Sequence, residues 1–112
     1  MRGTKFSVIG MGKYGRSIAQ ILSDRGAEVI AIDNREELIE EVEDFVALAV
    51  TMDATDGKAL ESQNIDECDA VVVAIGANFE ALLLCCFQLK ELGVKRIIAR
   101  SNDENQKKRQ KE

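Results

Sequence analysis

A short apolar run that leads into three closely spaced glycines constrains the fold of this chain more than any other feature. The segment FSVIGMGKYGRSIAQIL, residues 6–22, places Gly10, Gly12 and Gly15 between a β-branched run and a helical pattern. At such a turn the first glycine permits the sharp bend, the second lets a phosphate approach the backbone, and the third lets the helix pack close to the strand. The helix would then present unpaired N–H groups to an anion. A tight turn without a ligand uses the same glycines, so the surrounding sequence has to decide between the two interpretations.

Apolar runs and helical patterns alternate along the rest of the chain. The apolar runs are continuous, which is typical of strands covered on both faces of a parallel sheet. They occupy residues 5–10, 27–33, 46–53, 70–76 and 95–101. Helical patterns lie between them at residues 13–26, 34–45, 55–64 and 78–93, with Asn34 and Asn78 available as N-caps and Gly26 and Gly93 as C-terminal stops. This order predicts a Rossmann-like, doubly wound parallel α/β sheet with right-handed crossovers.

The length of 112 residues corresponds to one domain, and we expect residues 1–112 to form a single nucleotide-binding domain. The last residues, NDENQKKRQKE, begin like a capped helix but carry no apolar stripe. A sheet of this class usually has a sixth strand after a further crossover. We therefore expect a domain that is truncated after the fifth strand.

The composition argues against several classes of function. A net charge of −5 disfavours binding to the phosphate backbone of nucleic acids. No apolar run reaches the ~20 residues of a membrane span. The start MRGTK lacks the apolar core of a signal peptide, so we expect a cytoplasmic protein. Three cysteines, two of them adjacent, and the absence of histidine argue against a disulfide framework and a structural zinc site.

An acidic residue at the end of the second apolar run makes the glycine pattern more specific. Asp33 follows the glycine turn by about 20 residues, where a carboxylate accepts hydrogen bonds from a ribose diol and repels a 2′-phosphate. This favours adenine nucleotides or NAD over NADP, although Arg35 lies close by and would weaken that discrimination. Asp33 could instead cap the helix that begins in NREEL.

The ends of the other strands are candidate ligand contacts, because ligands in this fold bind at the carboxyl edge of the sheet. Asp53 closes the third run on the expected adenine side, and the small residues 74–77 close the fourth, leaving room for ribose and phosphates. Arg100 ends the fifth run and could face a phosphate. Asp53 as the N-cap of the next helix, and Arg100 as a solvated edge residue, are the alternatives.

The sequence offers little with which to transform a bound nucleotide. It has no histidine, its one tyrosine, Tyr14, lies in the glycine turn, and a phosphoryl-transfer lysine motif is missing. We therefore predict that the chain is not an enzyme. One alternative is the NAD-binding domain of an oxidoreductase, separated from its catalytic domain. Another is a redox sensor that uses Cys85 and Cys86, but these lie among leucines without a basic neighbour that would activate a thiol.

Four segments together resemble a known family. FSVIGMGKYGRSIAQIL, the acid in VIAIDN, the stretch DATDGKALESQNIDECDAVVVAIGANFEALLL, and IIARSND are similar to the RCK-N domains, also called KTN or TrkA-N. These are domains of the regulatory subunits of Ktr and Trk potassium transporters and of related potassium channels. The resemblance implies a non-enzymatic sensor in which ATP, ADP, NAD or NADH binds the glycine turn and changes the shape of a ring of subunits, and thereby ion flux.

The resemblance also implies roles for individual residues. The three glycines would receive the phosphates, Asp33 the ribose, and Asp53 and Thr55 would line the adenine side. Lys13 stands where the Ktr pattern often has an arginine that reaches a terminal phosphate in a neighbouring subunit. Lysine keeps the charge but lacks the bidentate fork, which weakens the expectation of strong ATP-over-ADP discrimination.

Residues and resemblance together predict one binding set and one kind of assembly. The predicted cofactor-binding residues are Gly10, Met11, Gly12, Lys13, Tyr14, Gly15, Asp33, Asn34, Asp53, Ala54, Thr55, Ala74, Ile75, Gly76 and Arg100. The expected partners are further copies of the chain, as a dimer or an octameric ring, and a membrane-embedded potassium transporter that holds the protein at the inner face of the cell membrane. We expect the exposed apolar face of ALLLCCFQL to help form the subunit interface. The C-terminal regulatory domain of the family is absent from these residues.

Overall fold

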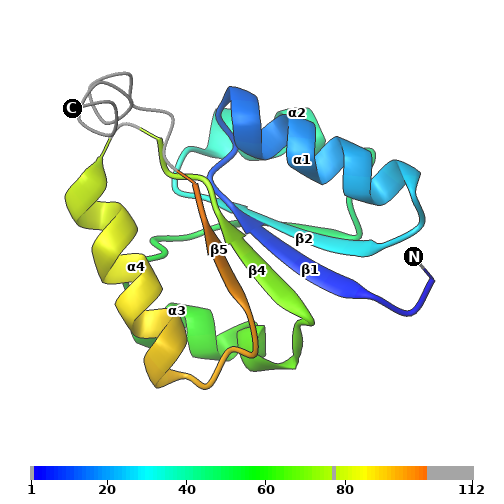
Figure 1. The fold of residues 1–112 in the computed structure, drawn as a ribbon. Coiled ribbons are helices and arrows are strands. Elements are labelled where there is room, and N and C mark those ends of the chain that lie inside the picture. The colour runs from blue at the N-terminus through cyan, green and yellow to red at the C-terminus, as the bar shows by residue number, and fades with distance from the viewer. Residues whose placement is uncertain (1, 77, 101–112) are drawn as a thin grey trace, which may run out of the picture.

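A computed structural model describes residues 2–76 and 78–100 of the chain as a parallel sheet with helices on both faces (Figure 1). The five strands are ordered β3-β2-β1-β4-β5, and every neighbouring pair is parallel. The elements, in chain order, are β1 (Lys5–Ile9), α1 (Lys13–Asp24), β2 (Glu28–Asp33), α2 (Glu36–Val42), β3 (Leu48–Thr51), α3 (Gly57–Ser62), a 3₁₀ turn (Ile65–Glu67), β4 (Ala70–Val73), α4 (Phe79–Glu91) and β5 (Ile97–Ala99). The predicted Rossmann-like α/β fold is confirmed.

The strand order creates a switch point at the centre of the sheet. From β1 the chain moves outward through β2 to β3, and it then crosses back to β4 on the other side of β1. The helices α1 and α2 cover one face, and α3 and α4 cover the other (Figure 1). Connections leave β1 and β4 toward opposite faces, so a crevice can open between their carboxyl ends.

The continuous apolar runs reflect burial on both faces. Along β4, Val71 and Val73 belong to the hydrophobic cluster that includes α3 and α4, whereas Val72 belongs to the cluster under α1 and α2. In β1, Val8 and Ile9 divide in the same way, and both are at most 1% exposed. Since neither face of the central strands meets water, both faces are mainly apolar. The buried polar residue of β1, Ser7, donates its hydroxyl to the carbonyl of Ile30 at 3.3 Å.

The strands are shorter than the sequence predicted. β3 ends at Thr51, not at residue 53, and β4 ends at Val73, not at residue 76. Each strand is followed by one more backbone bond to its neighbour. The N–H of Met52 donates to the carbonyl of Asp33 at 3.0 Å, and the N–H of Ala74 donates to the carbonyl of Ile9 at 2.7 Å. The predicted truncation after the fifth strand concerns residues outside the described ones, and so does Ala77.

One predicted helix cap is wrong and others are confirmed. Asn34 does not cap α2: Arg35 takes the N-cap position, and since a guanidinium has no acceptor, no side chain caps this helix. Asn78 does cap α4, and its Oδ1 accepts the N–H of Ala81 at 3.0 Å. Gly93 follows α4 with a φ of +79°, the left-handed conformation that a helix stop requires. Over the described part of the chain, no helix combines the length and apolar character needed to cross a membrane.

Candidate functional site

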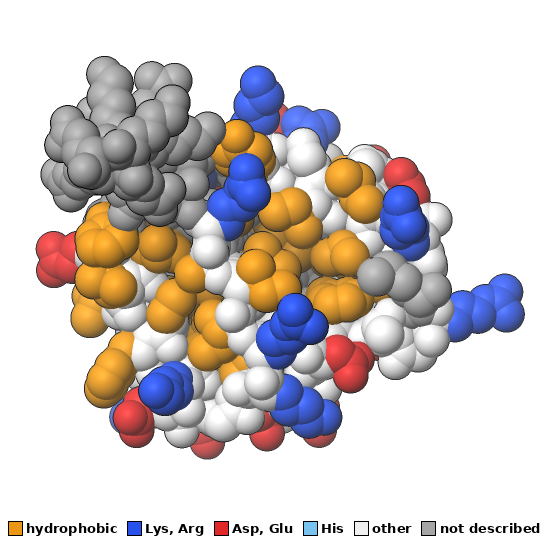
Figure 2. Space-filling model, in the orientation of Figure 1, with side chains coloured by type: hydrophobic (Ala, Val, Ile, Leu, Met, Phe, Trp, Pro, Cys, Tyr) orange, Lys and Arg blue, Asp and Glu red, His pale blue; other side chains and the backbone are white. Residues whose placement is uncertain are grey.

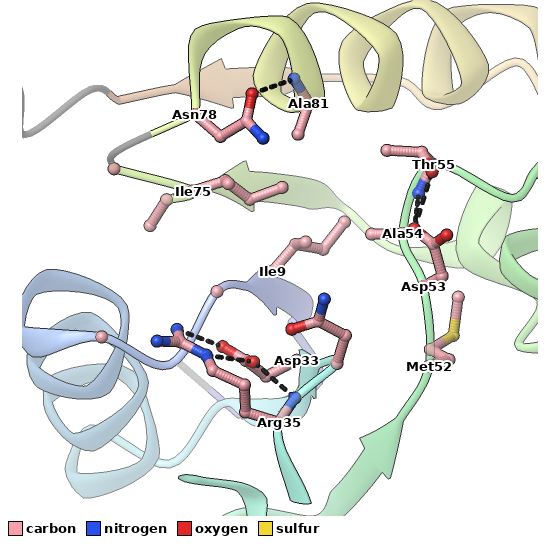
Figure 3. Close-up of a pocket in the computed structure, with 15 residues that line it drawn as sticks. Ile9, Asp33, Arg35, Met52, Asp53, Ala54, Thr55, Ile75, Asn78 and Ala81 are labelled. Atoms are coloured by element: carbon pink, nitrogen blue, oxygen red, sulfur yellow. Dashed lines mark hydrogen bonds and ion pairs between the residues drawn. The ribbon is translucent and has the colours of Figure 1, made fainter.

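A crevice of about 400 Å³ opens at the carboxyl edge of the sheet, at the switch point between β1 and β4 (Figure 3). Its volume lies in the range of small-molecule sites. The described residues that line it are Ile9, Gly10, Gly12, Asp33, Asn34, Arg35, Met52, Asp53, Ala54, Thr55, Ala74, Ile75, Gly76, Asn78 and Ala81. Every strand end except that of β5 therefore contributes to one concave surface.

The structure brings most of the predicted binding residues together at this surface. Those that line the crevice are Gly10, Gly12, Asp33, Asn34, Asp53, Ala54, Thr55, Ala74, Ile75 and Gly76, and those outside its lining are Met11, Lys13, Tyr14, Gly15 and Arg100. Five lining residues were not in the predicted set: Ile9, Arg35, Met52, Asn78 and Ala81. Ile9 and Met52 directly precede predicted strand-end residues, so allowing one residue more at each strand end would have found them.

The predicted residues outside the lining have other contacts. The Met11 side chain is 2% exposed and packs in the hydrophobic cluster under α1 and α2. Arg100 places its guanidinium carbon 4.7 Å from the centre of the Tyr14 ring, a cation–π contact that joins the end of β5 to the first turn of α1. Lys13 is exposed at the start of α1.

The three glycines of the turn have different structural roles. Gly10 has a φ of +101°, and a Cβ there would lie 2.6 Å from the carbonyl oxygen of Ala74. A Cβ on Gly15 would collide with the carbonyl group of Gly10. Gly12 has a φ of −68°, and a Cβ added to it would meet no atom within 4 Å. Packing therefore requires glycine at the first and third positions, whereas the second leaves open space.

The open position coincides with the start of a helix that lacks a side-chain cap. Gly12 is the N-cap of α1, no side chain caps it, and the first turn of the helix contains no acidic residue. The first N–H groups of a helix have no intrahelical acceptor and carry a partial positive charge. An anion that reaches Gly12 can therefore accept hydrogen bonds from this turn.

Asp33 is buried at the end of β2 and its carboxylate accepts four hydrogen bonds. Its Oδ2 accepts the N–H of Met11 at 2.7 Å and the Arg35 Nη2 at 3.1 Å. Its Oδ1 accepts the N–H of Arg35 at 2.8 Å and the Arg35 Nε at 3.0 Å. Asp33 thus ties the glycine turn to the start of α2, although it is not itself the N-cap of that helix.

These bonds determine the ionisation of Asp33. Burial alone would raise its pKa, but the bond from the Arg35 side chain and the backbone N–H groups of Met11 and Arg35 outweigh that effect and lower the pKa. The bond to Asp33 likewise raises the pKa of Arg35, against the opposing effect of its own burial. The pair is therefore charged on both sides at neutral pH.

Asp53 has a local structural role on the opposite wall. Its Oδ1 accepts the Thr55 N–H at 2.9 Å and the Thr55 hydroxyl at 2.7 Å, and these bonds lower its pKa. Asp53 is not the N-cap of α3, because Asp56 holds that position and accepts the N–H groups of Lys58 and Ala59. The N-cap alternative for Asp53 is therefore wrong.

The cysteines do not form a reactive centre. Burial raises the pKa of Cys85 to about 12, and burial also raises the pKa of Cys86 and of Cys68. Since the thiolate is the reactive form, these thiols are poor nucleophiles at neutral pH. Within residues 2–76 and 78–100, no group of three or more acidic, histidine or cysteine side chains could hold a metal ion.

The low pKa of Asp33 predicts a pH-dependent stability. The hydrogen bonds to the ionised Asp33 carboxylate stabilise the fold at pH values above the ordinary aspartate pKa of about 4. This stabilisation is lost as the pH falls through the lower pKa of Asp33 in the folded state. We expect Asp33→Asn to lower the free energy of unfolding by about 1–3 kcal/mol at pH 7. Urea denaturation should show the gap between the two proteins narrowing below about pH 4. A gap that stays constant from pH 7 to pH 3 would contradict this assignment.

Comparison of the sequence with known proteins identifies relatives of this chain. The sequence matches the TrkA-N domain family over residues 6–112. It is 38% identical over 104 residues to the Ktr system potassium uptake protein C of Bacillus subtilis, covering 93% of this chain and 47% of that protein. It is 34% identical over 99 residues to the Ktr system potassium uptake protein A of Vibrio alginolyticus, covering 88% of this chain and 45% of that protein. The chain thus spans about half the length of these relatives.

A solved structure has the same fold as this chain. The NAD(P)-binding domain of an exopolyphosphatase-related protein from Archaeoglobus fulgidus superposes with a TM-score of 0.75 at 27% identity, covering 95% of this chain and 80% of that domain. The fold, the switch-point crevice and the match over nearly the whole sequence agree with one another. The chain belongs to the TrkA-N domain family.

Proposed function

We propose that this chain is the nucleotide-sensing domain of a regulatory subunit that controls potassium uptake through a membrane transporter. The observation that carries the proposal is the crevice itself, in which the open backbone at Gly12 and the buried Asp33 line the same surface. The names of the sequence relatives support the link to potassium uptake. In this account the chain is cytoplasmic and lies at the inner face of the membrane through its transporter partner.

An adenine nucleotide fits the distribution of polar and apolar groups around the crevice. Its phosphates would lie over Gly12 at the start of α1, where N–H groups are available. Its ribose would lie beside Asp33, at the end of β2. The base would reach the wall that Met52 and Ala54 form after β3, across from Ile75 after β4 (Figure 3).

The acids of the crevice are suited to binding and not to catalysis. A general acid or base works best with a pKa near the operating pH. Asp33 and Asp53 both have lowered pKa values, and both are held by hydrogen bonds from neighbouring groups. At neutral pH they remain ionised and are weak bases, so a bound nucleotide would leave the crevice intact. Regulation would then follow from a difference in nucleotide affinity between two shapes of the assembly.

Nucleotide binding and turnover can be measured on the same protein. Calorimetric titrations with ATP, ADP, NAD, NADH and NADPH should show saturable 1:1 binding for at least one of them. Absorbance at the NADH band should stay constant when the protein is incubated with NADH and a panel of carbonyl substrates. Glu41→Ala, which removes an exposed acid paired with Arg16 outside the crevice, should bind like the wild type. No binding by any nucleotide would contradict the proposal, and steady NADH consumption would favour the oxidoreductase alternative.

We further propose that α4 joins two copies of the chain. One side of this helix, with Leu82, Cys85 and Leu89, is buried in the core. The opposite side carries large apolar side chains that are about half exposed: Phe79, Leu83, Leu84 and Phe87. Hydrophobic side chains gather over α4 on the molecular surface (Figure 2). A two-fold interface uses the same patch on both copies, so this exposed apolar stripe would pack against the same stripe of a second copy.

A charge in the centre of this stripe tests the interface. We expect wild-type protein to be a dimer or a larger oligomer by light scattering, and Leu83→Arg to shift it to monomers without changing its circular dichroism. The matched control is Ile21→Arg on α1, because Ile21 is 53% exposed and Leu83 is 54% exposed. This control should keep the wild-type mass. If Leu83→Arg also keeps that mass, the helix is not the interface.

A further inference from the structure

The side chain of Arg35 is hydrogen-bonded to the Asp33 carboxylate, which is the group that the ribose of a nucleotide would use. Its Nε and Nη2 donate to the two oxygens of Asp33 at 3.0 and 3.1 Å, a bidentate pair on the wall of the crevice. In Figure 3 the guanidinium lies directly against the Asp33 carboxylate, between it and the start of α1. This arrangement bears on which nucleotides the site can accept.

The carboxylate has no acceptor capacity to spare. Its two oxygens offer about four lone-pair sites, and four N–H donors occupy them. A ribose diol that donates to Asp33 must therefore displace existing donors. The N–H groups of Met11 and Arg35 are fixed by the glycine turn and by the start of α2. The guanidinium is the donor that can move, because the Arg35 side chain is 55% exposed, against 3% for Asp33.

Arg35 also supplies the positive charge of the crevice. Among the described residues that line it, Arg35 is the only one with a basic side chain. With Asp33 it forms a pair without net charge, so the carboxylate no longer repels a phosphate on the 2′ oxygen as an isolated one would. A guanidinium that leaves the carboxylate remains at the crevice wall, where it can bind such a phosphate through two N–H groups.

We propose that Arg35 determines ribose specificity by competing with an unmodified ribose diol for Asp33 and by pairing with a 2′-phosphate when one is present. The proposal rests on the proposed nucleotide-binding function. Nucleotides with a free diol bind only after the Arg35–Asp33 pair opens, which weakens their binding. Nucleotides with a 2′-phosphate regain an ionic contact when the pair opens. The crevice therefore discriminates between the two classes less than Asp33 alone would.

NAD and NADP test this directly, because they differ only by the 2′-phosphate. In calorimetric titrations we expect Arg35→Ala to bind NAD about 2–5-fold more tightly than the wild type, because the guanidinium that competes for Asp33 is 55% exposed to solvent. We expect it to bind NADP about tenfold more weakly, as for loss of a charge-assisted contact. Arg35→Gln should fall between the two proteins. The control is Arg16→Ala, which removes an arginine of similar exposure, 51% against 55%, that pairs with Glu41 outside the crevice and should leave both affinities unchanged.

The possible outcomes separate this inference from the proposed function. If the wild type binds neither nucleotide, nor any other adenine nucleotide, the proposed function fails. If nucleotides bind but Arg35→Ala keeps the wild-type NAD-to-NADP affinity ratio within about twofold, or binds NAD more weakly, the competition is wrong. A second readout needs no variant: the Nε–H resonance of Arg35 in ¹⁵N-labelled protein should shift when NAD is added. An unshifted resonance at saturation would also overturn the proposal.

Discussion

The contact between Gly15 and the carbonyl group of Gly10 is the constraint on which the rest of the site depends. Since no Cβ intervenes, α1 begins directly against the end of β1, and Gly10 in turn packs against the backbone of Ala74 after β4. This packing fixes the helix N-terminus at the one place where the strand order reverses. The crevice and its open backbone at Gly12 are consequences of that position.

The second constraint is the carboxylate of Asp33, which connects three segments. It accepts a backbone bond from the glycine turn, accepts another from the residue before α2, and pairs with the Arg35 side chain. The same group therefore stabilises the fold and forms the wall of the crevice. A ribose that donates to Asp33 would compete with the Arg35 guanidinium, while the two backbone bonds would keep the glycine turn and the start of α2 in place.

The sequence predicted the features that follow from local patterns. The glycine spacing, the continuous apolar runs and Asp33 at a strand end are properties of short segments, and they predicted the fold and most of the crevice lining. The remaining features depend on neighbours that are distant in sequence. That β4 stops at Val73 depends on where its partner strands end, and the contact between Arg100 and Tyr14 requires β5 and α1 to meet.

Two side chains show more closely what the sequence patterns do not predict. Arg35 is two residues from Asp33, and its proximity was evident, but no pattern shows that its guanidinium would use the last acceptor sites of the carboxylate. Asn34 is a favourable N-cap residue by type, yet α2 begins one residue later, with Arg35 at the N-cap. For Arg35 the burial of Asp33 decides, because a buried carboxylate must satisfy its acceptor sites with donors that are close by.

The measurement that tests the account most directly is the affinity of Gly12→Ala for ADP. The new methyl group would meet no atom of the protein within 4 Å, and the φ of −68° suits alanine. The free energy of unfolding of the variant should therefore lie within about 1 kcal/mol of the wild-type value. Calorimetry should show its ADP affinity reduced by about tenfold or more, because the methyl group fills the space through which a phosphate approaches the backbone. A folded Gly12→Ala protein with wild-type ADP affinity would contradict the placement of the phosphates at this turn.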